Sequence, residues 1–167
     1  MKPMRSINKT LLIASLLIAV MSCEQQPEQR EAERQKGSFD PILAEQYGAD
    51  EYGMKKYVLA FLRRGPNQDL DSVQKAELQM AHLKNINRMA EEGKLVLAGP
   101  FFGNDDLRGI YVFNVESLAE AEELTGTDPS IQAGLLTMEL KEWYGSAALV
   151  GVNEIHESLM KKDIVPD

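Results

Sequence analysis

Lys55–Leu62, with the sequence KKYVLAFL, is an almost uninterrupted run of aromatic and apolar residues, and it decides the fold. The turn-forming residues Arg63–Asn67 follow at once, so we predict a buried β-strand that a turn ends. Both faces of this strand carry large apolar side chains: Tyr57, Leu59 and Phe61 on one face, and Val58, Ala60 and Leu62 on the other. Strands of this kind are buried on both faces. Helices can cover one face of the sheet, and a second copy of the chain would cover the other, so we expect a homodimer.

The elements that follow this strand predict the topology. Their order is strand, helix, strand, strand, helix, strand, which is the βαββαβ pattern of an α+β, ferredoxin-like fold. A further short helix is expected near the C-terminus. The predicted segments are the strand 55–62, a helix from Asp71 or Ser72 to Glu92, the hairpin strands 95–101 and 110–115, a helix 118–124, the strand 135–143 and the C-terminal helix 153–162.

The first 23 residues have the pattern of a lipoprotein signal. Three basic residues precede an apolar run, Leu11–Met21, which is too short to cross a bilayer as a helix. Ser22-Cys23 follows, and Val20–Cys23 resembles the lipobox in which a thiol accepts a diacylglycerol. An ordinary signal peptide with an incidental cysteine is the alternative. We therefore predict a lipid anchor on Cys23 and a place in the cell envelope, either the periplasm or the outer membrane.

Composition restricts the partners and the domain organisation. The chain has 26 acidic and 18 basic residues, a formal net charge of −8, which argues against nucleic-acid binding and makes the lipid the only membrane contact. Two histidines and one cysteine predict no metal site, and we expect no cofactor. The expected parts are the signal peptide 1–22, a disordered tether 23–50, in which Phe39–Tyr47 could form a short docking helix, one domain 51–146 and a C-terminal extension 147–167.

The ordered set of motifs between residues 55 and 146 resembles the YCII-related (YciI-like) domain family. These motifs are Leu62–Pro66, Ala81–Leu83, Glu92–Pro100, Asp128-Pro129, Ala133–Leu135 and Trp143. The resemblance implies a dimeric α/β barrel with a His and an Asp as its catalytic pair. It also implies an elimination of chloride from a chlorinated, hydroxylated aromatic compound as the best-understood chemistry. Typical members are cytoplasmic, so the lipoprotein signal is a departure from the family. It bears on which substrate to expect more than on which fold to expect.

His82 and Asp128 are the candidate catalytic residues. His82 lies on the apolar side of the first long helix, where a buried imidazole needs a hydrogen-bond partner. Asp128 follows the second helix, at what should be the same edge of the sheet, so it could fix the tautomer of His82 and stabilise its charged form. The plainer interpretations are a core histidine and an aspartate that caps the turn at Pro129-Ser130.

Five further residues are candidates for substrate binding. Arg63 and Arg64 alternate in direction, so one should reach a cleft, where it could hold a carboxylate or a phenolate. Gly99 and Pro100 favour a close backbone approach and a strand bend near the site. Trp143 could stack on a planar ligand, although core or dimer packing is the simpler role.

Two functions remain open from the sequence. The first is cofactor-free acid/base chemistry by His82 with Asp128, an elimination or isomerisation of a small cyclic compound. The second is a non-catalytic module of the envelope that binds a small molecule or a partner. An open cleft beside His82 favours the first, and a His82 enclosed in the core favours the second.

Overall fold

The computed structural model describes residues 38–165, and the elements below belong to one unit, Asp40–Asp167. The signal peptide 1–22, Cys23 and most of the expected tether lie outside the described residues. The last part of that tether is helical, because helix α2 spans Pro41–Tyr47. The Asp40 carboxylate caps this helix by accepting from the backbone N–H groups of Ile42 and Leu43. The short helix that the sequence left open near Tyr47 is therefore present.

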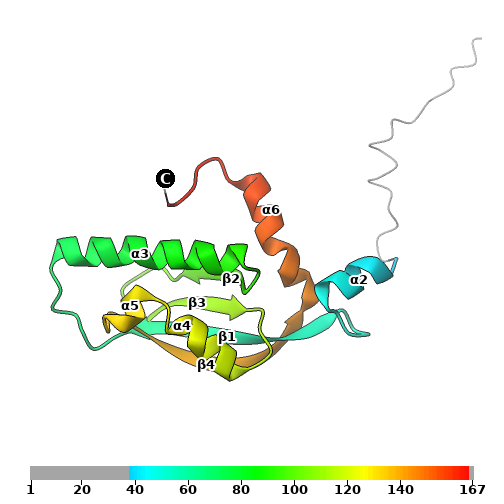
Figure 1. Cartoon of the computed structure of the whole chain (residues 1–167), viewed down its shortest axis with the longest axis horizontal. Coiled ribbons are helices and arrows are strands. Elements are labelled where there is room, and N and C mark those ends of the chain that lie inside the picture. The colour runs from blue at the N-terminus through cyan, green and yellow to red at the C-terminus, as the bar shows by residue number, and fades with distance from the viewer. Residues whose placement is uncertain (1–37, 166–167) are drawn as a thin grey trace, which may run out of the picture. The chain divides into compact units, whose positions relative to one another are not determined.

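The core of the unit is a four-stranded antiparallel sheet with the order β2-β3-β1-β4. Helix α3 connects β1 to β2, and helices α4 and α5 connect β3 to β4 (Figure 1). This arrangement is the predicted α+β, ferredoxin-like βαββαβ fold. The bounds are β1 Met54–Arg64, α3 Ser72–Glu91, β2 Leu95–Pro100, β3 Leu107–Phe113, α4 Leu118–Thr125, α5 Pro129–Gln132 and β4 Leu136–Ser146.

Helix α3 begins and ends where its sequence directs. The Asp71 side chain accepts from the backbone of Gln74, and the Gln74 side chain accepts from the backbone of Asp71, which completes a capping box. Gly93, with a φ of 69°, follows the last turn in a left-handed conformation that glycine adopts freely. Between these ends, α3 buries His82, Asn85 and Met89 toward the sheet.

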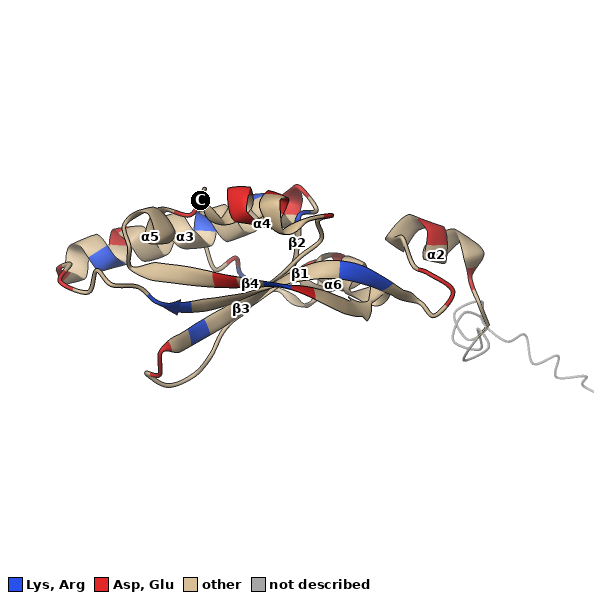
Figure 2. Ribbon diagram, turned by 90° about the horizontal axis from the view of Figure 1, so that it is seen from below, with Lys and Arg blue, Asp and Glu red and all other residues tan. Residues whose placement is uncertain are grey.

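Helices α3, α4 and α5 all cover the same face of the sheet (Figure 2). The side chains of this face form the main apolar cluster, which includes Val58, Ala60 and Leu62 from β1, Tyr111 and Phe113 from β3, and Met89 from α3. Burial of these side chains supplies the driving force for folding.

The opposite face of the sheet is covered only in part. Tyr57, Val96 and Val112 form a second buried cluster there, and Leu149 and Val150 of the 3₁₀ helix η1 (Ala147–Gly151) pack against it. Trp143 of β4 lies against Tyr57 with ring centroids 5.9 Å apart, yet 39% of its surface is exposed. This face therefore keeps apolar surface that the described residues do not cover.

Several boundaries differ from the sequence prediction: β3 begins at Leu107 and not at residue 110, and β4 continues to Ser146 instead of ending at residue 143. β1 continues through Arg63 and Arg64, which the sequence assigned to the turn, because both residues pair with the beginning of β4. The turn comes at Gly65, where a Cβ would lie 2.2 Å from the carbonyl oxygen of Gly134, so only glycine allows this contact. The C-terminal extension forms η1 and helix α6 (Val152–Leu159). No helix within residues 38–165 is long and apolar enough to span a membrane.

Candidate functional site

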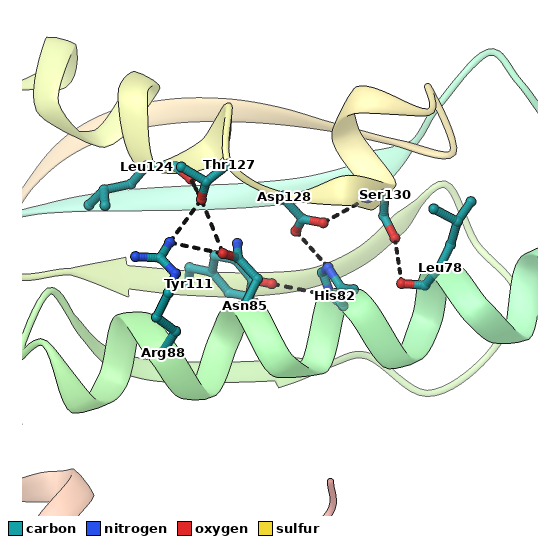
Figure 3. A network of polar contacts seen from close by, with 9 residues as sticks. All are labelled: Leu78, His82, Asn85, Arg88, Tyr111, Leu124, Thr127, Asp128 and Ser130. Carbon is teal, nitrogen blue, oxygen red and sulfur yellow. Dashed lines mark hydrogen bonds and ion pairs between the residues drawn. The ribbon is translucent and has the colours of Figure 1, made fainter.

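His82 forms the centre of a hydrogen-bonded chain between α3, β3 and the segment before α5 (Figure 3). Its Nδ1 atom lies 2.6 Å from Oδ2 of Asp128, and its Nε2 atom lies 3.2 Å from the hydroxyl of Tyr111. All three residues are buried: the exposed fraction is 7% for His82, 0% for Asp128 and 2% for Tyr111. The pairing of His82 with Asp128 that the topology predicted is thus present.

Asp128 uses its two carboxylate oxygens for different purposes. Oδ1 accepts from the backbone N–H of Ser130 at 2.8 Å and caps helix α5, and Oδ2 faces His82. Pro129 occupies the first position of the helix, where its missing N–H costs nothing. The capping role and the pairing role, which the sequence allowed together, therefore coexist in one side chain.

Tyr111 stays a neutral hydroxyl in this site. Burial raises the pKa of Tyr111 far above its usual value, and the nearby negative charge of Asp128 raises it further. A protonated phenol can donate to Nε2 of His82, while the carboxylate of Asp128 can only accept. These two contacts together favour the neutral imidazole tautomer with its proton on Nδ1 and its lone pair on Nε2.

A cavity of about 250 Å³ opens beside this chain, and His82 and Tyr111 form part of its wall. A cavity of about 150 Å³ is large enough for benzene, so this one is large enough for a single substituted ring. The walls are mostly apolar, which strengthens any hydrogen bond made inside. The other lining residues are Leu62, Gln79, Leu83, Ile86, Asn87, Ala98, Gly99, Pro100, Arg108, Gly109, Leu136 and Ile164.

The structure separates the five predicted binding residues. Gly99 and Pro100 line the His82 cavity, and Arg64 lines an adjoining cavity. Arg63 points elsewhere, because its guanidinium pairs with Glu139 at 3.1 Å and with Asp106 at 3.3 Å. Trp143 packs on Tyr57 at the opposite face of the sheet, so it lines neither cavity. The close approach expected at Gly99 occurs instead at Gly109, where a Cβ would lie 2.6 Å from the Gly99 carbonyl oxygen.

Three residues of the site were not found from the sequence. Tyr111 and Arg108 belong to the hairpin strand β3, whose alternation was visible, but the register that puts Tyr111 opposite Ala60 and beneath α3 was not. Ile164 comes from the C-terminal tail, which had no assigned role, and it reaches the cavity beside Asn87. Only tertiary packing could bring this tail to the site.

A second polar cluster lies beside Asp128 and consists of Asn85 and Arg88 of α3 together with Thr127. The Asn85 side-chain oxygen accepts from Arg88 at 2.9 Å and from the Thr127 hydroxyl at 3.1 Å, which fixes the residue next to Asp128. The Asn85 Nδ2 atom is buried, and among the described residues it has no hydrogen-bond partner. Within residues 38–165, no three His, Cys, Asp or Glu side chains are grouped as a metal site requires.

Comparison of the chain with known proteins identifies one matching family. The model of the YCII-related domain matches residues 57–144. The uncharacterized protein YjpA of Bacillus subtilis (strain 168) is 36% identical over 62 residues, which are 37% of this chain and 71% of YjpA. Among solved structures, a 5-chloro-2-hydroxyhydroquinone dehydrochlorinase from Burkholderia phenoliruptrix AC1100, in complex with 2,5-dihydroxybenzoquinone, matches with a TM-score of 0.40 and 21% identity. That match covers 52% of this chain and 92% of the other.

The contacts of Asp128 lead to a prediction about the His82 tautomer. In Asp128→Asn the side-chain oxygen should keep the bond to the Ser130 N–H, which turns the amide NH₂ toward Nδ1 of His82. A donor at that place reverses the tautomer and removes the lone pair from Nε2. Ring ¹⁵N NMR shifts would record the change, with the exposed His156 as the internal control. Identical ring shifts in both proteins would show that Asp128 does not set the tautomer.

Proposed function

This chain belongs to the YCII-related domain family, and on that premise we propose that it is a cofactor-independent acid/base enzyme acting on a small cyclic compound. The observation that carries the proposal is the chain of contacts from Asp128 through His82 to Tyr111 at the wall of a ring-sized cavity. An imidazole whose Nδ1 is held by a buried carboxylate presents Nε2 as a base. A phenol held in its protonated form stands beside that base as a hydrogen-bond donor.

The proposed reaction begins with proton removal from carbon. Nε2 of His82 takes a proton from a carbon next to a ring carbonyl. The C–H electron pair forms a C=C bond, and the π pair of the carbonyl moves to the oxygen to form an enolate. Asp128 stabilises the resulting imidazolium, and the Tyr111 hydroxyl turns from Nε2 to donate to the enolate oxygen. Collapse of the enolate then expels a leaving group from the carbon next to the deprotonated one, after which His82 loses its proton to solvent. Otherwise the imidazolium returns the proton to a different carbon. The first outcome is an elimination and the second an isomerisation.

One observation favours the alternative of a non-catalytic binding module. In the described structure Nε2 of His82 already accepts from Tyr111, and His82 is only 7% exposed. A ligand must displace this contact before His82 can act as a base. If no substrate does so, the cavity would bind a ring compound without changing it.

Exchange of carbon-bound hydrogen in D₂O tests the proposed base. Wild-type protein should catalyse deuterium incorporation next to the carbonyl of small hydroxylated cyclic ketones, and NMR would follow it. His82→Gln should lower the exchange rate by about 10²- to 10⁴-fold, the usual contribution of a general base. His156→Gln, which changes an exposed histidine of α6, is the matched control and should leave the rate unchanged. Exchange that survives in His82→Gln would contradict the mechanism, and no exchange by wild-type protein would favour the binding module.

We also propose that the domain is a homodimer formed through the open face of the sheet. Phe61 supports this, because it lies on the face opposite to Ala60 and Leu62 and stays only half-buried. Its neighbours across the strands are Ile110 and Glu139. Trp143 lies on the same face, next to Tyr57, and is 39% exposed. A second copy would bury this surface and close two sheets into the barrel that the family resemblance implies.

A charge placed in this face should break the dimer. The wild-type chain should sediment at twice its chain mass at micromolar concentration. Phe61→Lys should sediment as a monomer, because the neighbouring Glu139 is already paired with Arg63 and Lys141 and burying a further ammonium is costly. Leu118→Lys on α4 is the control, since Leu118 is 42% exposed at the helix-covered face. Sedimentation of wild-type protein as a soluble monomer would exclude this dimer.

We propose further that Cys23 carries a lipid that holds the protein in the cell envelope. The support is the basic start, the short apolar run and the Ser22-Cys23 pair of the sequence. Cys23→Ser should give either an uncleaved precursor or a protein without lipid. Metabolic labelling with a fatty acid measures this directly, and label that remains on Cys23→Ser would refute lipidation at this residue.

A further inference from the structure

A group of basic side chains borders the His82 cavity. A second cavity of about 290 Å³ adjoins the first, and the two share Gln79, Arg108 and Leu136 as lining residues. Arg64 and Lys75 line only the second cavity. The lining residues of the two cavities include no aspartate or glutamate. This is unexpected in a chain with 26 acidic and 18 basic residues, in which a random patch of surface would be acidic.

The three cations at this border have no carboxylate partner among residues 38–165. Arg64 donates to the carbonyl and the side-chain oxygen of Asn104, and Lys75 donates to the carbonyl of Gln68. Arg108 donates from Nη1 to the carbonyls of Gly103 and Asp105. The nearby Asp106 carboxylate pairs instead with Arg63. The three cations are thus held in place by neutral groups and form no ion pair with residues 38–165.

The fold keeps two of these guanidinium groups together. Both Arg64 and Arg108 hydrogen bond to the loop that joins β2 to β3, at residues 103–105. Basic residues lie at the end of β1 and the start of β3, which meet at one end of the sheet (Figure 2). For Arg108 only Nη1 makes hydrogen bonds within the described residues, so Nε and Nη2 are left to contact a ligand.

We propose that Arg64, Lys75 and Arg108 form an anion-binding subsite that orients the substrate beside His82. The inference rests on the proposed function and names its substrate class: a single-ring compound that carries a carboxylate or another anionic group. The ring occupies the first cavity, and the anionic group lies toward the second, where guanidinium donors match its geometry. A local positive site also overcomes the repulsion that an acidic protein exerts on an anion. The neutral donors of Gln79 lie between the two positions.

Calorimetric titration of the full chain with a matched ligand pair tests the subsite. The probes are 4-hydroxybenzoate and its neutral isostere 4-hydroxybenzamide. Wild-type protein should bind the acid at least about tenfold more tightly, the effect of one charge-assisted hydrogen bond. Arg108→Gln and Lys75→Gln should each weaken binding of the acid and leave binding of the amide unchanged. Added salt should weaken binding of the acid alone because it screens the charges.

The control variant is Lys84→Gln, which changes an exposed lysine of the same helix as Lys75 and should bind both probes like wild-type protein. Lys75→Gln also covers the case in which Arg108→Gln does not fold, since Lys75 lies near the start of α3 and outside the apolar clusters. Equal binding of acid and amide by wild-type protein, or no binding of either, would overturn the subsite.

His82→Gln separates this proposal from the proposed function. The variant should keep the preference for the acid, because its cations are intact, while it loses deuterium exchange. A preference for the acid without any exchange in wild-type protein would support the subsite and reject the enzyme. Deuterium exchange without a preference for the acid would support the enzyme and reject the subsite.

Discussion

The buried carboxylate of Asp128 connects parts of the chain that no local interaction could bring together. Its Oδ1 atom fixes the start of α5, and its Oδ2 atom holds the imidazole of His82 on α3, 46 residues earlier in the chain. Tyr111 on β3 then completes the series from the other side of the imidazole. A fully buried carboxylate is tolerated only when hydrogen bonds satisfy it, so the position of α5 and the orientation of His82 depend on each other. Because His82 and Tyr111 line the cavity, this mutual dependence also fixes part of the cavity wall.

The two faces of the sheet have different roles because the connections between strands lie on only one of them. The helix-covered face packs the main core and leaves a ring-sized cavity where α3, β2 and β3 meet. The other face is capped at one end by η1 and otherwise keeps apolar surface. Charge is divided in a similar way. The chain as a whole is acidic, while the cavity border collects arginine and lysine that neutral oxygens hold in place.

The sequence predicted the order of the elements because each is determined by local pattern. The double-faced run at Lys55–Leu62 indicated a buried strand, and the cap at Asp71 and Gly93 defined α3 within about one residue. The pairing of His82 with Asp128 was also predictable, since the βαββαβ topology brings their two elements to one edge. For Arg63 and Trp143 the sequence left two roles open: cleft or solvent for Arg63, and ligand stacking or packing for Trp143. Both side chains lie on the face of the sheet that the cavity does not reach. The residue that each one contacts depends on how the neighbouring strand pairs, which the sequence does not show.

What the sequence determined by itself was the class of fold, the apolar stripe that holds His82 and the turn that holds Asp128, because strand alternation, helical period and capping are properties of neighbouring residues. What only the tertiary structure decided was the environment of the imidazole. The register between β1 and β3 places Tyr111 against Nε2 and buries it, which keeps its hydroxyl protonated. The loop after β2 gathers Arg64 and Arg108, and the C-terminal tail brings Ile164 to the cavity. These contacts join residues that are distant in the chain, and their geometry depends on how strands and helices pack, which no local pattern encodes.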